Sequence, residues 1–273
     1  MHISQSWRST TSAQVARFRS RMIRYAGVVG VTVAAGLALV AGSGTAYAIA
    51  NGTPVPEGLY PFSTKLTMTN IPNPDGTTRN SACSAALIAP QWIITAGHCF
   101  HDVSGKRVSG PVPYPTTATV GRTDLSGTGG HVVNVIEVRQ GPRGDVALGK
   151  LDTAITDIAP LPLSAAAPKS DAVLRVTGWG ATSSVNPVPV TQLQTGQVKV
   201  KRVTGSSVLV VGFAPAPDTS ACVWDSGAPY FNEGPSGPAL VSIESDGPAC
   251  PHSQEETTSR VDRIADWIRQ TTA

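Results

Sequence analysis

The 273-residue sequence predicts an all-β protein that ends in one α-helix. Short segments alternate apolar and polar residues, which is the pattern of half-buried strands. The 27 glycines and 22 prolines gather between these segments, where they favour turns. Only 14% of the residues are charged, against about 25% in an average soluble protein. This composition disfavours a coiled coil, a disordered chain and a nucleic-acid-binding protein that relies on a basic surface.

Residues 1–48 have the pattern of a secretory signal peptide. Five arginines precede an apolar run of about 16 residues, which is shorter than the roughly 20 residues of a membrane-spanning helix. The triplet Ala46-Tyr47-Ala48 then places small residues before a cleavage site after Ala48. We therefore expect a secreted, extracellular chain. A membrane anchor, or a cut elsewhere in residues 41–50 followed by trimming, is the alternative. Without residues 1–48 the net charge of +3 becomes slightly negative.

The strands and the helix follow from periodicity. The segment Gln197–Val203 alternates with a clean period of two. The expected strands lie at residues 62–68, 132–138, 174–177, 197–203, 208–211 and 239–243. Turn clusters at 71–76, 110–115 and 186–189 separate the segments. Near the C-terminus, Ser259 is the expected N-cap of a helix that carries Val261, Ile264, Ala265 and Ile268 on one face.

Three short motifs contain the candidate catalytic residues His98, Asp145 and Ser226. Each motif alone is a weak signal, but the order His, Asp, Ser along one chain is more specific. A serine hydroxyl is too weakly acidic to attack an amide unaided, so a histidine must accept its proton. An aspartate then fixes the imidazole tautomer and stabilises the imidazolium. The pattern therefore predicts a nucleophilic hydrolase.

From Ile49 to the C-terminus the sequence resembles the chymotrypsin/trypsin family of secreted serine proteases, of the bacterial type. The matching motifs are Ile-x-x-Gly at Ile49, Thr-Ala-x-His-Cys, Asp-Val-Ala-Leu, Gly178-Trp179-Gly180, Asp-Ser-Gly-x-Pro and the terminal Trp267-Ile268. The resemblance implies a protease domain at 49–273, built as two packed six-stranded antiparallel β-barrels with the catalytic groups in the crevice between them. It implies an endopeptidase for protein or peptide substrates, working as a monomer through an acyl-enzyme intermediate. No cofactor, metal, nucleic acid or lasting membrane anchor is expected.

The resemblance also assigns roles to the cysteines and to a supporting serine. Four cysteines in an exported chain allow three disulfide pairings. The family pattern selects Cys83–Cys99 and Cys222–Cys250, and it makes Ser242 the serine that supports Asp145. The rival hypothesis is a metal site formed by Cys83, His98, Cys99 and His101, although this spacing is not a familiar zinc pattern.

The sequence departs from the family at the oxyanion hole, which would use the backbone N–H groups of Trp224 and Ser226. The family has glycine at the position of Trp224, and a Cβ restricts the backbone there. Loss of one donor lowers turnover by about 10²–10³. A catalytically silent homologue that serves as a binding scaffold, and a hydrolase biased towards esters, are therefore alternatives.

The resemblance places Ser220, Ser242, Glu244 and Glu256 at the specificity pocket. Ser220 stands where trypsin-type enzymes have an aspartate, so a neutral pocket and an apolar P1 side chain are expected. The two glutamates stand near positions where the family has glycines. In the pocket, these glutamates would narrow it or make it acidic, and an acidic pocket would favour basic P1 residues. Alternatively, they are carboxylates of solvated loops.

The family is activated when a new N-terminal ammonium pairs with the aspartate before the nucleophile. Here these groups are Ile49 and Asp225, and Ile49 directly follows the expected cleavage site. We therefore expect signal peptidase itself to make the activating cut.

Overall fold

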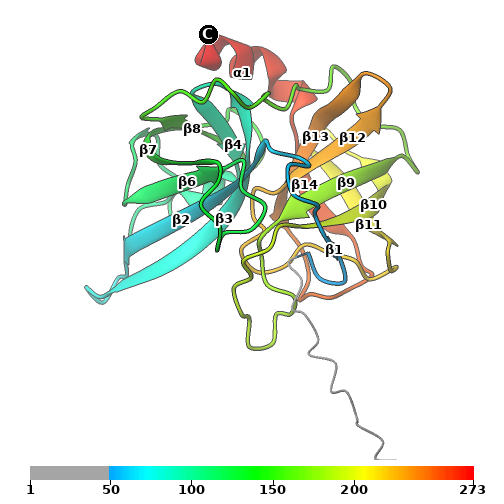
Figure 1. Ribbon diagram of the computed structural model, residues 1–273, viewed down its shortest axis with the longest axis horizontal. Coiled ribbons are helices and arrows are strands. Elements are labelled where there is room, and N and C mark those ends of the chain that lie inside the picture. Colours follow the sequence, from blue (N-terminus) through cyan, green and yellow to red (C-terminus); the bar gives the residue numbers. More distant parts are fainter. Residues whose placement is uncertain (1–48) are drawn as a thin grey trace, which may run out of the picture. The chain divides into compact units, whose positions relative to one another are not determined.

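The computed structural model describes residues 49–273. The expected signal peptide lies outside the described residues. Strands dominate the described chain and form two antiparallel sheets (Figure 1). Each sheet contains seven strands, one of which is a two-residue strand at its edge; the other six close into a barrel. This architecture confirms the predicted fold class.

The first barrel contains residues 63–151. Its strands are β2 (Ser63–Pro72), β3 (Thr78–Ala89), β4 (Trp92–Thr95), β6 (Thr116–Val120), β7 (His131–Gln140) and β8 (Ala147–Leu151), with β5 (Gly110–Pro111) paired to β7. Their order is β7-β6-β2-β3-β4-β8, and pairing of β7 with β8 closes the barrel. The short 3₁₀-helix η1 (Gly97–Cys99) follows β4.

The second barrel contains residues 173–260. Its strands are β9 (Val173–Gly178), β10 (Gln194–Val203), β11 (Ser207–Ala214), β12 (Pro229–Gly234), β13 (Gly237–Asp246) and β14 (Glu256–Arg260), with β1 (Thr53–Pro54) paired to β10. Their order is β10-β11-β14-β13-β12-β9, and pairing of β9 with β10 closes this barrel. The chain ends in η2 (Asp262–Ile264) and α1 (Ala265–Thr272).

The six strands predicted from alternation are all present, as β2, β7, β9, β10, β11 and β13. The sequence missed strands such as β4 and β8, because nearly every residue in them is buried and no alternation remains. The predicted start of the helix was wrong. Ser259 lies in β14, where it pairs with Ile243, and α1 begins at Ala265 after the 3₁₀ turn.

The two barrels meet along β2 and β3 of the first and β9 and β12 of the second. The Phe62 and Phe231 rings pack edge-on with their centroids 5.3 Å apart, and the Ser63 and Thr177 hydroxyls lie 2.8 Å apart. The Ser84 backbone N–H donates to the Ser226 carbonyl at 2.9 Å. These contacts fix the loops of one barrel against those of the other, which positions residues from both at one crevice.

Candidate active site

His98 projects from η1, immediately after the buried strand β4. Its Nδ1 lies 2.6 Å from Asp145 Oδ2, and its backbone N–H donates to Asp145 Oδ1 at 2.9 Å. A Cβ on the preceding Gly97 would lie 2.5 Å from Gln140 Oε1 and 2.9 Å from Asp145 Oδ1, so glycine eases this close approach, although both atoms are ends of side chains that can shift. The bidentate contact fixes both the ring and the backbone of His98 against the carboxylate.

Asp145 begins the turn into β8 and is held by groups from both barrels. Its backbone N–H donates to Ser259 Oγ at 3.0 Å, and Ser245 Oγ donates to its Oδ2 at 3.0 Å. Arg107 Nη1 lies 3.3 Å from Oδ1. Burial raises the pKa of Asp145, but the hydrogen bonds and charge of His98, together with the Ser245 hydroxyl, outweigh burial and leave the pKa below its ordinary value. Asp145 is therefore a carboxylate at neutral pH.

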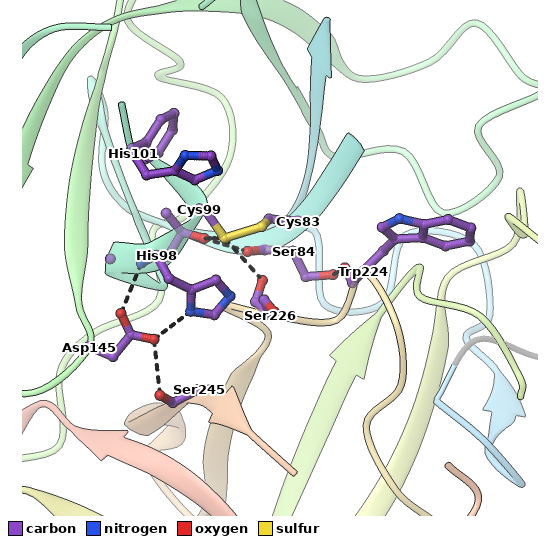
Figure 2. The surroundings of a disulfide bond; sticks show 12 residues. Cys83, Ser84, His98, Cys99, His101, Asp145, Trp224, Ser226 and Ser245 are labelled. Atoms are coloured by element: carbon purple, nitrogen blue, oxygen red, sulfur yellow. Dashed lines mark hydrogen bonds and ion pairs between the residues drawn. A yellow bond between two sulfur atoms is a disulfide. The ribbon is translucent and has the colours of Figure 1, made fainter. Parts of the chain in front are cut away.

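The structure brings all three predicted catalytic residues together. Figure 2 shows the His98 imidazole between Asp145 and the side chain of Ser226. Ser226 and His98 both line the same two cavities, of about 710 Å³ and about 300 Å³. No hydrogen bond joins Ser226 Oγ to His98 among the described residues, and such bonds often tighten only when substrate binds.

The segment Cys222–Ser226 forms a tight turn that leaves two backbone donors free. The Asp225 N–H donates to the Cys222 carbonyl at 2.9 Å, whereas the N–H groups of Trp224 and Ser226 have no acceptor within the described chain. Trp224 has a φ of 74° at the third position of this turn, where a type II turn normally has glycine. The tryptophan thus adopts the glycine-like backbone, and Figure 2 shows its indole directed away from Ser226.

The serine that supports Asp145 is Ser245, so the prediction of Ser242 was wrong. Ser242 is buried, and its hydroxyl accepts a hydrogen bond from Thr258 at 2.7 Å. The pairing of β13 with β14 has a bulge between Glu244 and Asp246, which leaves Ser245 without a cross-strand partner. A bulge redirects the side chain of its extra residue, here towards Asp145. The sequence carried no local signal for this bulge, nor for Arg107.

The larger cavity beside Ser226 is the candidate specificity pocket. One wall is Ala221–Val223, the other is Ser245–Cys250, and Glu244 also lines it. Ser220 and Glu256 do not line it directly. Ser220 is buried behind the wall, where its Oγ accepts from the His252 backbone N–H at 3.3 Å. Two acidic residues of β13, Glu244 and the exposed Asp246, line this cavity, and so does Arg107, whereas Ser220 does not reach its surface. The role of Ser220 in P1 selection stays a prediction.

Glu244 and Glu256 are 5% and 1% exposed, so they are not solvated loop carboxylates. The Tyr230 hydroxyl lies 2.8 Å from Glu244 Oε2 and 2.7 Å from Glu256 Oε2. A tyrosine hydroxyl has only one proton to donate, so the second contact requires a protonated carboxyl group. Burial and repulsion by Glu256 raise the pKa of Glu244 well above its ordinary value. Burial raises the pKa of Glu256 to about 7.

The two disulfides pair Cys83 with Cys99 and Cys222 with Cys250. The first joins β3 to the end of η1 beside His98, and the second connects the two walls of the pocket. The disulfide at Cys83 and Cys99 leaves no thiolate to bind a metal with His98 and His101, which contradicts the rival hypothesis of a metal site.

Asp225 and Ile49 also meet. Ile49 packs in the core of the second barrel, and its backbone amide is one of the groups that hydrogen-bond Asp225. Asp225 is fully buried and accepts further bonds from the N–H groups of Gly180 at 2.8 Å and Cys222 at 3.1 Å. Burial nevertheless raises the pKa of Asp225 to about 6.

Comparisons with known proteins agree with this geometry. The family model described as Trypsin matches residues 49–268. The rat protein "Transmembrane protease serine 9" is 29% identical over 216 residues, covering 70% of this chain and 19% of the relative. Mouse "Transmembrane protease serine 11G" is 26% identical over 262 residues, covering 85% and 58%. This chain therefore spans about a fifth of the first relative and less than two thirds of the second.

The solved structure of neuropsin, a serine protease expressed in the limbic system of mouse brain, has the same fold. It superimposes with a TM-score of 0.66 at 19% identity and covers 82% of this chain and 100% of its own. The relatives named here are mammalian, so they do not support the expected bacterial type. No helix within residues 49–273 is long and apolar enough to cross a membrane. By the match to the family model over most of its length, the chain belongs to the trypsin-like family of serine proteases.

Proposed function

We propose that residues 49–273 form a secreted serine endopeptidase that cleaves protein or peptide substrates and works as a monomer. The observation that carries this proposal is the pairing of His98 with an ionised Asp145 beside Ser226, next to two unpaired backbone N–H groups. The arrangement supplies a nucleophile, a base and an oxyanion hole at the wall of one cavity.

In the proposed mechanism, Ser226 Oγ attacks the substrate carbonyl while His98 Nε2 accepts its proton. Asp145 accepts the hydrogen bond from Nδ1 and stabilises the imidazolium that forms. The N–H groups of Trp224 and Ser226 stabilise the negative charge on the carbonyl oxygen. His98 then protonates the leaving amine, and a water molecule hydrolyses the acyl-enzyme by the same steps in reverse.

Residues 1–48 remain a proposed secretory signal peptide. The family match begins at Ile49, directly after the expected cleavage site, which supports this boundary. The two disulfides support an oxidising compartment outside the cytoplasm. Mass spectrometry of the protein recovered from the medium should show Ile49 as the first residue, and any other N-terminus would move the boundary.

For the substrate, the acidic pocket favours a basic P1 side chain over the apolar one expected from Ser220. Glu244 lines the cavity, and the contacts of Glu244 and Glu256 with the one Tyr230 hydroxyl require a proton on one of the two carboxyl groups. A lysine or arginine side chain that enters the pocket would replace this proton as the partner of the carboxylates. An empty pocket needs no such cation, because this proton keeps the pair partly neutral.

A fluorophosphonate probe tests the function, because it reacts only with an activated serine. Labelling should occur on Ser226 and should be lost in His98→Ala and in Ser226→Ala. Ser63→Ala is a matched control, since Ser63 is a buried serine of β2 whose hydroxyl contacts Thr177 rather than the site. Absence of labelling in folded, disulfide-bonded wild-type protein would favour a binding scaffold.

A further inference from the structure

Lys65 is a buried lysine that the proposed mechanism does not use. It lies in β2, is 7% exposed, and its Nζ donates to the Trp179 carbonyl oxygen at 3.1 Å. Lysine is almost never buried without a partner, because the loss of hydration of an ammonium group is costly. A neutral carbonyl alone does not offset this cost, so the groups beyond the carbonyl matter.

The next group is Asp225, on the other side of the same peptide unit. The carbonyl oxygen of the Trp179–Gly180 peptide accepts from Lys65, and the N–H of that peptide donates to Asp225 Oδ1 at 2.8 Å. The peptide dipole therefore has its negative end at the ammonium and its positive end at the carboxylate. Each charge stabilises this orientation, and the peptide in turn links the two charges.

The glycines on both sides of Trp179 make this arrangement possible. A Cβ at Gly178 would lie 2.1 Å from Asp225 Oδ1, and a Cβ at Gly180 would lie 2.3 Å from Oδ2. Any side chain at either position would therefore push this backbone away from the carboxylate. The Gly178-Trp179-Gly180 motif thus has a geometric role in joining the carbonyl partner of Lys65 to Asp225.

Asp225 is fully buried, so its carboxylate is costly without a cation nearby. Glu244 and Glu256 face it from β13 and β14, and the charge of Asp225 raises the pKa of both. In the uncut chain Ile49 contributes only a neutral backbone N–H, since its ammonium exists only after cleavage. Lys65 is present in both forms. Burial lowers the pKa of Lys65 and the charge of Asp225 raises it, and the resulting value of about 8 leaves the amine largely protonated at neutral pH.

We infer that Lys65 is a positioning residue that keeps Asp225 ionised through the Trp179–Gly180 peptide. By doing so it holds the turn Cys222–Ser226 in its active form, both before and after cleavage at Ile49. This inference rests on the proposed protease function. It changes the expectation for activation, because cleavage at Ile49 then increases an activity that already exists.

The test compares two secreted forms of the full chain. The first starts at Ile49; the second carries one alanine inserted after Ala48, so that its ammonium lies one residue away from Asp225. Each form is made with Lys65, Lys65→Met and Lys65→Arg, and each N-terminus is verified by mass spectrometry. The readouts are kcat/KM against pH and labelling of Ser226 by a fluorophosphonate.

With Lys65 present, the extended form should keep at least about one tenth of the kcat/KM of the form that starts at Ile49. Lys65→Met should lower kcat/KM at least about tenfold more in the extended form than in the normal form, because the extended variant has neither cation near Asp225. Activity of the extended form should fall in alkali near the Lys65 pKa of about 8. Lys65→Arg should move this fall to higher pH, because a guanidinium does not deprotonate there.

Two results would overturn the inference. One is an extended form that is inactive although Lys65 is present and the normal form is active. The other is an equal loss in both forms on Lys65→Met, which would indicate a packing role only. If Lys65→Arg does not fold, the Lys65→Met comparison decides alone. Absence of Ser226 labelling in the normal wild-type form is a separate result, which would refute the protease function and the inference with it.

Discussion

Replacing Trp224 with glycine should increase turnover, because Trp224 occupies a backbone conformation that suits glycine. Its φ of 74° lies in the left-handed region, where a side chain costs about 1–2 kcal/mol. A flip of the preceding peptide would convert the turn to type I, which tolerates tryptophan with a negative φ. That flip would also turn the Trp224 N–H away from the oxyanion hole.

The strain sets the size of the expected effect. Glycine removes a penalty of about 1–2 kcal/mol, and about 1.4 kcal/mol corresponds to a tenfold change in an equilibrium or a rate. Where the flipped turn is the main form, kcat should rise by about five- to thirtyfold, and by less where it is a minor form. KM should change little, because the oxyanion contact acts mainly in the transition state. The free energy of unfolding should change by less than about 1 kcal/mol, since glycine also increases the entropy of the unfolded chain.

The assay is amide hydrolysis by the purified secreted protein, with active sites titrated by a fluorophosphonate. Trp224→Ala is the matched control, because it removes the indole but keeps the Cβ that causes the strain. It should show no gain in kcat. Equal or lower kcat in folded Trp224→Gly would show that the tryptophan already presents its N–H fully. The same gain in Trp224→Ala would assign the effect to the indole, which lines the smaller cavity beside Ser226.

Three further predictions concern the carboxylates and their partners. Ser245→Ala should lower kcat about fivefold through loss of one hydrogen bond to Asp145. Ser242→Ala should reduce thermal stability and leave kcat unchanged. Equal effects of both variants on kcat would contradict the assignment of Ser245 as the serine that supports Asp145. The ratio of kcat/KM for arginine to kcat/KM for phenylalanine at P1 should rise with pH, and it should fall about tenfold or more in Glu244→Gln. A preference for phenylalanine at every pH would refute the proposed acidic pocket. The pKa of Glu256 is about 7 in the folded state and 4.5 ordinarily, so between these pH values the folded state binds a proton that the unfolded state has lost. The free energy of unfolding should therefore fall as the pH rises from about 4.5 to about 7. Urea unfolding should show this fall, on the order of 3 kcal/mol, reduced in Glu256→Gln. An unchanged pH dependence in that variant would mean that Glu256 does not cause the fall.

The candidate catalytic residues could be found from sequence because each lies in a short motif with a local structural reason. His98 lies in η1, directly after a fully buried strand. Ser226 follows a turn that is closed by a local hydrogen bond from Asp225 to Cys222. Strands with one buried face were also readable, because alternation is a property of the strand itself.

Residues that act across the fold could not be found in this way. Ser245 supports Asp145 because of a bulge in the pairing of β13 with β14, and register is set by both strands and the core together. The sequence therefore misassigned this role to Ser242, three residues earlier. The same limit applies to Ser259, which was expected to cap a helix and instead accepts the Asp145 N–H from within β14.

By itself, the sequence determined the all-β architecture, the order of the catalytic motifs and the cysteines available for two disulfides. The tertiary structure alone decided which charges are buried together. Glu244 and Glu256 share the Tyr230 hydroxyl, and Lys65 reaches Asp225 through a peptide of a third segment. The physical reason is that the cost of a buried charge depends on every group around it, and these groups come from strands that are distant in sequence and meet only when the barrels close.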